Sequence, residues 1–194
     1  MSWLDDMIPF LKDQESLHDQ VGVDVEGHGK LTYGYGHLDA DGVLGNKISQ
    51  MNTSEYQAWS DSTLTSDLNK AYVSGRQSFS NIYSGATHDV KTSGGSYTTD
   101  YSVYDSLPDN AKAIITDFQF NLGNIKGYPK LMNALKDGDW ETVKKEYKRT
   151  LGGKELTKRN KGILDKYISP SPLNKIKTDN KVFNQLLNTE KSLF

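Results

Sequence analysis

Residues 15–37, ESLHDQVGVDVEGHGKLTYGYGH, follow the pattern Glu-x8-Asp-x7-Thr-x-Gly-x-Gly-His, in which the carboxylates of Glu15 and Asp24 and the hydroxyl of Thr32 surround a glycine-rich turn. Upstream, apolar residues recur at helical spacing around Pro9, which is tolerated only in the first turn of a helix. A short helix is therefore expected to end near Glu15. Two strand-like runs follow, residues 21–25 and 31–35, separated by a turn-forming stretch at 26–29. The sequence predicts a helix followed by a β-hairpin.

Glu15 and Asp24 are candidate catalytic carboxylates. Because side chains alternate along a strand, Asp24 should point away from the neighbouring valines, and Thr32 on the partner strand could share its face. A water molecule could be held between them. Cleavage of a glycosidic bond needs one carboxylic acid to protonate the leaving oxygen and one ionised carboxylate to activate water.

This motif resembles the phage-type lysozymes of glycoside hydrolase family 24. The resemblance implies that Glu15 is the general acid, Asp24 the water-activating base and Thr32 the water-positioning hydroxyl. It implies cleavage, with inversion, of the β-1,4 bond between N-acetylmuramic acid and N-acetylglucosamine in peptidoglycan. The residues of the turn that closes the motif are Gly34, Gly36 and His37. We expect the glycines to permit unusual backbone shapes and the histidine to be structural, hydrogen-bonded between two lobes.

The resemblance continues downstream and covers most of residues 7–168. Residues 52–68 resemble the family's long helix between two lobes, and residues 113–123 resemble its central buried helix. The resemblance thus implies an α+β, lysozyme-like fold, in which the long helix joins a small hairpin lobe, residues 16–51, to a larger helical lobe.

Two further polar residues are candidates for substrate binding. Asn121 could meet the N-acetyl groups of a substrate, or it could simply end a buried helix. Arg159 lies in a segment that resembles the one whose arginine approaches the catalytic glutamate. It could pair with Glu15 or lie on a solvated basic face.

The chain also departs from the family's pattern. The turn between Asp24 and Thr32 is two residues longer than the commonest family spacing. Residues 78–104 resemble an insertion, rich in Ser, Thr, Gly and Tyr, that would form a surface excursion or a small extra hairpin. Residues 169–194 form a Pro-linked extension after a catalytic domain of residues 1–168.

Local signals place the helices. Asn52 and Glu55 form a capping-box sequence for a helix running to about Gly75. Ser106 is expected to cap another helix, which Gly123 ends in a left-handed conformation. Further helices are expected at residues 130–135, 140–147 and 156–167.

Composition limits the possible functions. The 194 residues include no cysteine, and the four histidines lack ligand spacing, so no metal or other cofactor is expected. No apolar run is long enough to span a membrane. No secretory signal is visible, so we expect synthesis in a host cytoplasm and action in the periplasm through a holin-dependent pathway, or attachment to a virion tail.

The net charge of −2 hides an asymmetry. Residues 1–125 carry 7 basic and 17 acidic side chains, whereas residues 126–177 carry 14 and 6. A basic C-terminal region favours an anionic polymer such as the peptidoglycan glycan strands with their acidic stems. Nucleic acid is not expected, because no nucleic-acid motif or interleaved aromatic pattern is present. We expect a monomer.

Alternatives stay open at this stage. Asp24 could only cap the hairpin turn, and Thr32 could be an ordinary strand residue. The chain could be a wall-binding structural component of a phage tail or secretion device without useful turnover. A lytic transglycosylase, which uses one glutamate, is a nearer rival, although Asp24 at the family spacing argues against it.

Overall fold

The computed structural model describes residues 2–22, 30–83, 90–91, 97–151 and 154–169. The chain has an α+β fold, in which helices dominate and the strands of the described part form three small two-stranded antiparallel sheets. Among these residues, no helix is both long and apolar enough to cross a membrane.

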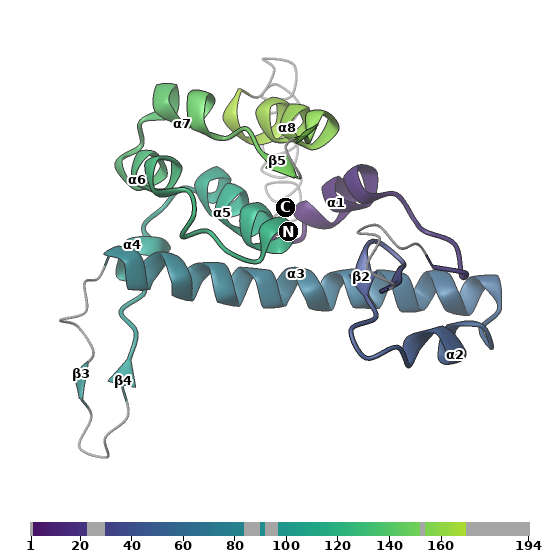
Figure 1. Cartoon of the computed structure of the whole chain (residues 1–194). Coiled ribbons are helices and arrows are strands. Elements are labelled where there is room, and N and C mark those ends of the chain that lie inside the picture. The colour runs from purple at the N-terminus through teal and green to yellow at the C-terminus, as the bar shows by residue number, and fades with distance from the viewer. Residues whose placement is uncertain (1, 23–29, 84–89, 92–96, 152–153, 170–194) are drawn as a thin grey trace, which may run out of the picture.

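The longest element is helix α3, Thr53–Tyr83, which runs across the whole molecule (Figure 1). It begins with the expected capping box, since the Asn52 N–H donates to the Glu55 carboxylate at 2.8 Å and the Glu55 N–H donates to the Asn52 side-chain oxygen at 3.0 Å. The expected end near Gly75 was wrong. The helix continues because its buried face continues, with Phe79 fully buried against Tyr104.

The other longer helices lie on one side of α3 (Figure 1). They bury one large hydrophobic cluster, to which the fully buried Ile114, Ile115 and Phe118 of the central helix contribute. The helices on this side of α3 are α1 (Met7–Glu15), α5 (Asp109–Leu122), α6 (Pro129–Asp137), α7 (Trp140–Glu146) and α8 (Thr157–Ile163). The expected single helix at residues 156–167 is instead α8 followed by a π-helical turn, η1 (Leu164–Ile168).

A second, smaller cluster lies at the N-terminal end of α3, where the short helix α2 (Leu44–Ile48) and a hairpin pack against it (Figure 1). The hairpin consists of β1 (Thr32–Tyr33) and β2 (His37–Leu38), with Thr32 opposite Leu38. The sequence analysis expected residues 31–35 to pair with residues 21–25. Residues 23–29 lie outside the described part, and the partner strand that the structure contains comes after β1.

The end of α3 connects to α5 through a segment that the sequence analysis treated as an insertion at residues 78–104. Its first residues belong to α3 and its last belong to α4 (Ser102–Asp105). Between them, β3 (Val90–Lys91) pairs with β4 (Tyr97–Thr98), which agrees with the extra hairpin that was one of two expectations.

Two expected helix boundaries had different outcomes. Ser106 does not cap α5. It follows α4, where its hydroxyl donates to the Val103 carbonyl at 2.9 Å, and Pro108 precedes the first turn of α5 instead. Gly123 does end α5 in a left-handed conformation, with φ of 65° and its N–H donating to the Gln119 carbonyl. The remaining strands, β5 (Thr150–Leu151) and β6 (Lys154–Glu155), precede α8.

Candidate functional site

Glu15 is the last residue of α1, as expected, and its side chain is 25% exposed. The helix ends here because Ser16 adopts a positive φ of 58°. The carbonyl groups of the last turn would lack partners, but Lys158 at the start of α8 donates to the carbonyls of Asp13 and Gln14. The first turn of α8 therefore holds the backbone on which Glu15 sits.

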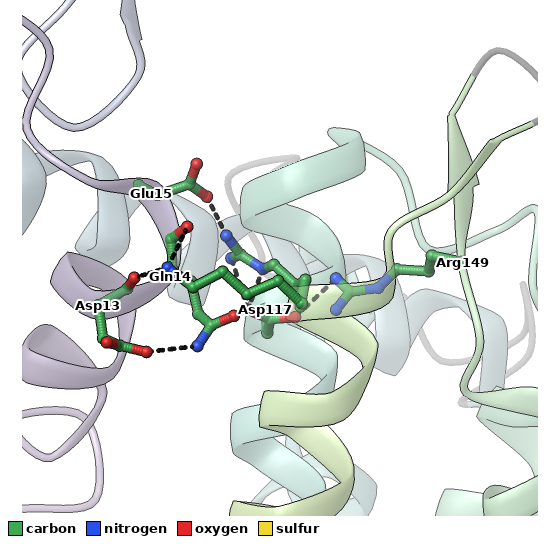
Figure 2. A network of polar contacts seen from close by, with 7 residues as sticks. Asp13, Gln14, Glu15, Asp117 and Arg149 are labelled. Atoms are coloured by element: carbon green, nitrogen blue, oxygen red, sulfur yellow. Dashed lines mark hydrogen bonds and ion pairs between the residues drawn. The ribbon is translucent and has the colours of Figure 1, made fainter.

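The carboxylate of Glu15 faces a buried network of charged groups (Figure 2). Arg159 Nη1 forms an ion pair with Glu15 Oε1. The same guanidinium contacts Asp117 Oδ1 through Nη2 at 2.6 Å and Nε at 3.2 Å. Arg149 Nη1 lies 2.6 Å from the other oxygen of Asp117. The expected pairing of Arg159 with Glu15 is thus confirmed, and the alternative of a solvated basic face is wrong.

Sequence reasoning missed Asp117 and Arg149, whose side chains are both 0% exposed. The signal for Asp117 was present: it lies on the apolar face of α5, one turn after Ala113 and next to Phe118. A carboxylate on a buried face needs a cation, because an unpaired charge is costly to remove from water. The sequence could not indicate which cation.

Asn121, one turn after Asp117 on α5, reaches the same arginines. In the amide orientation that suits its neighbours, its side-chain oxygen accepts from Arg159 Nε at 2.5 Å and lies 3.3 Å from Arg149 Nη1. This contact gives Asn121 a structural role at the end of the helix. Its expected contact with substrate N-acetyl groups stays a prediction.

The pKa values of the two arginines shift in opposite directions. Burial lowers the pKa of Arg149, and the single carboxylate of Asp117 does not fully offset this effect. Burial also disfavours the charged form of Arg159, but Asp117 and Glu15 together outweigh it and raise the pKa of Arg159. Both guanidiniums stay protonated at any physiological pH. With Asp117 and Glu15 ionised, the network contains two cations and two anions.

The hairpin turn approaches Glu15 at Gly36. This residue has a φ of 89°, and a Cβ atom added there would lie 3.9 Å from Glu15 Oε2. Gly34, with φ of 59°, fits against α3: its N–H donates to the Tyr56 hydroxyl at 2.8 Å, and a Cβ would lie 3.0 Å from Ser60 Oγ. Both glycines therefore have the unusual backbone shape that the sequence predicted, and Gly34 in addition allows a close approach to α3.

His37 joins the hairpin to α3, since its Nδ1 lies 2.5 Å from Asp67 Oδ2. The hydrogen bond expected of His37 is present, and its structural rather than catalytic role stays a prediction. Thr32 Oγ1 lies 3.3 Å from His18 Nδ1. Asp24 lies outside the described residues, so its distance from Glu15 and its relation to Thr32 stay predictions.

A groove of about 370 Å³ opens beside this turn, between the hairpin, α3 and α5. Its lining combines polar side chains with one aromatic ring and includes Gly36, His37, Asp67, Gln119 and Phe120. Gly36 borders both the groove and Glu15. The acid and the groove are thus neighbours. Within the described part of the chain, no group of three or more His, Asp or Glu side chains could hold a metal ion.

No protein-family model, curated protein or solved structure matches this chain.

Proposed function

We propose that this protein is an inverting muramidase that cleaves the β-1,4 bond between N-acetylmuramic acid and N-acetylglucosamine in peptidoglycan. The observation that carries the proposal is a glutamate at a helix end, fixed by a buried arginine and lying against Gly36, a residue of the hairpin turn that also lines a groove. The two hydrophobic clusters joined by α3 are compatible with a lysozyme-like division into a hairpin lobe and a helical lobe.

In this mechanism, Glu15 protonates the glycosidic oxygen and Asp24, aided by Thr32, directs water to the opposite face of the sugar. The two oxygens of Glu15 have different surroundings. Oε1 accepts from Arg159, whereas Oε2 is the oxygen near Gly36 and the groove. A protonated carboxyl group still accepts hydrogen bonds through its other oxygen. Oε2 is therefore the atom that would carry the proton, and Arg159 would hold the group in place.

The charge distribution supports an anionic substrate. Basic side chains are concentrated in residues 126–177, and exposed lysines include Lys126 before α6, Lys130 on α6 and Lys145 on α7. Attraction to the acidic stems of the cell wall would raise the local concentration of substrate and weaken with salt. The proposal places synthesis in a host cytoplasm and action on the wall in the periplasm, with attachment to a virion tail as the alternative.

The test compares Glu15→Gln with the wild-type protein in a turbidity assay on chloroform-treated Gram-negative cells. We expect Glu15→Gln to lose lysis while the chain stays folded with a lower melting temperature, because the Gln amide oxygen still accepts from Arg159 but the two arginines then face one carboxylate. Glu141→Gln is a matched control. It makes the same change at a 76% exposed glutamate on α7 and should lyse like the wild type.

Product analysis decides between reaction types. Reducing ends with inverted anomeric configuration support the proposal, which predicts a carboxyl separation of roughly 6.5–9.5 Å between Glu15 and Asp24. Anhydro sugars would identify a lytic transglycosylase instead. Sedimentation of the protein with the wall, without released sugar, would identify a wall-binding component. Full activity in Glu15→Gln would remove the role assigned to Glu15.

A further inference from the structure

We infer that Asp117 is a positioning residue for Glu15 and acts through Arg159. The inference rests on the proposed function. Asp117 itself contacts neither the groove nor Glu15, and its side chain is fully buried on α5. Its carboxylate instead determines where the guanidinium of Arg159 lies, and that guanidinium determines how Glu15 is oriented.

The contacts use both edges of the guanidinium. Asp117 Oδ1 accepts from Nε and Nη2 of Arg159, which leaves Nη1 directed at Glu15 Oε1. Because a guanidinium is planar, fixing one edge on Asp117 fixes the direction of the remaining N–H groups. Without Asp117, Arg159 would keep the neutral Asn121 oxygen as a partner but would lose the charged two-point contact, and its long side chain would be less restricted.

Asp117 is in turn held by a second cation. Arg149 Nη1 contacts Asp117 Oδ2 at 2.6 Å, and the Arg149 guanidinium lies 4.4 Å from the centre of the Phe118 ring. The backbone of Arg149 is fixed by Asn160, which accepts from its N–H and donates to its carbonyl, each at 3.1 Å. Asn160 directly follows Arg159 on α8. The contacts among Arg149, Asp117 and the Arg159–Asn160 pair therefore form a closed ring, to which Glu15 is attached through Arg159.

The network therefore determines which carboxyl oxygen of Glu15 faces Gly36. With Oε1 fixed by Arg159, Oε2 is the oxygen beside Gly36 and the groove. Loss of Asp117 would release Arg159 and let the Glu15 carboxyl turn away from a substrate oxygen. Catalysis is sensitive to small misplacements of the acid. Binding of the glycan strand should be spared, because Asp117 does not line the groove.

The decisive comparison is between Arg149→Met and the double variant Arg149→Met/Asp117→Asn. Asp117→Asn alone would leave two buried guanidiniums facing one carboxylate and could unfold the chain. The two chosen variants both lack Arg149, and they differ only at residue 117. With soluble peptidoglycan fragments, we expect kcat to be on the order of 10–100-fold lower in the double variant than in Arg149→Met, with KM changed by less than about twofold.

A spectroscopic readout tests the same inference without turnover. The Arg159 Nε–H lies 3.2 Å from buried Asp117 Oδ1 and 2.5 Å from the Asn121 oxygen, so its ¹⁵N-detected signal should be protected from exchange with water. Arg159→Lys identifies that signal by its disappearance. Because Asn121 stays in both variants, we expect exchange of this Nε–H with water to be about tenfold or more faster in the double variant than in Arg149→Met, rather than the signal to be absent.

Asp105→Asn serves as a matched control. It removes a carboxylate of α4 that pairs with Arg76 of α3, away from Glu15. It should keep the wild-type kcat. A double variant with the kcat of Arg149→Met, or an Nε–H exchange rate that does not change with the loss of Asp117, would overturn the inference. A wild-type protein that releases no sugar would refute the proposed function instead, while the Nε–H comparison would still decide whether Asp117 holds Arg159.

Discussion

At the scale of single residues, two glycines with nearly the same conformation have different surroundings. Gly34 has a φ of 59° and Gly123 a φ of 65°, so a side chain at either position would be strained. A Cβ at Gly34 would also lie 3.0 Å from Ser60 Oγ and 3.2 Å from Ser60 Cβ, inside a buried contact with α3. At Gly123 no heavy atom lies within 4 Å of that position. Comparing substitutions at Gly34 and Gly123 therefore distinguishes the cost of backbone strain from the cost of crowding.

We therefore expect Gly34→Ala to lower the free energy of unfolding by about 2–4 kcal/mol, since overpacking adds to the strain. Gly123→Ala, which has only the strain, should lower it by about 1 kcal/mol. Urea denaturation of both variants measures the difference. Equal losses would mean that the hairpin turn can move away from Ser60 at no cost.

The sequence predicted a contact between two residues where a motif indicated both of them. It did not predict contacts that only the tertiary fold brings about. The order of residues 15–37 indicated Glu15, and a similar segment indicated Arg159, so their pairing could be expected. Asp117 and Arg149 are distant in sequence, and their contact exists only because α5 and the segment before β5 meet in the core. A buried charge can be recognised from its apolar neighbours, but its partner is set by tertiary packing.

At the scale of elements, the same distinction between local and tertiary causes recurs. The capping box at Asn52 and Glu55 and the left-handed end at Gly123 depend on hydrogen bonds that span only a few residues, so both were predicted. The end of α3 and the start of α5 depend on α4, which packs against the last turns of α3. Ser106 was therefore misplaced, although Ser is a common cap.

The contact between α3 and α4 includes an ion pair that makes a pH-dependent contribution. Arg76 donates to Asp105 through Nε at 2.9 Å and Nη2 at 2.6 Å, and its guanidinium lies 4.0 Å from the centre of the Tyr101 ring. The hydrogen bonds from Arg76 hold the pKa of Asp105 below its ordinary value. A carboxyl whose pKa is lower in the folded state stabilises the fold above its unfolded pKa, about 4, and loses this contribution as pH falls through the folded value.

Asp105→Asn should therefore destabilise the protein at pH 7 and have little effect below about pH 3. The expected loss at pH 7 is about 0.5–1 kcal/mol, because the Asp105 side chain is 50% exposed and solvent screens the pair. Urea unfolding from pH 7 to pH 3 measures it. If the difference between variant and wild type stayed constant over this range, the ion pair would not be its source.

At the scale of the whole molecule, the candidate site draws on both hydrophobic clusters. Glu15, Arg159 and Asp117 lie on helices that pack around the larger cluster, whereas Gly36 and His37 belong to the hairpin beside the smaller one. Among the residues that the structure describes, the smaller cluster has three buried hydrophobic members: Tyr33, Ile48 and Tyr56. A cluster this small should open at a lower free energy than the helical core. The distance between acid and turn thus depends on how firmly the hairpin stays docked.

Tyr56 on α3 is the main polar link in that docking. Its hydroxyl accepts from the Gly34 N–H at 2.8 Å and lies 2.9 Å from the carbonyl oxygens of His18 and Asp19, to which it donates. One side chain thus ties the turn of the hairpin and the segment after Glu15 to the long helix. Tyr56→Phe would keep the ring in the cluster but leave these backbone groups without that partner, at a cost of about 1–3 kcal/mol.

If the hairpin end opens as a separate unit, this loss should be local. We expect amide hydrogen exchange in β1 and β2 of Tyr56→Phe to accelerate by about tenfold or more, while the amides of α5 exchange at the wild-type rate. Wall lysis should fall in parallel, because the turn at Gly36 would spend less time beside Glu15. Ser49→Ala provides a control, since it removes an exposed hydroxyl near the same cluster, one that donates to the Asn46 carbonyl three residues earlier. Equal acceleration in α5 would show that both clusters unfold together and that α3 transmits the loss through the whole molecule.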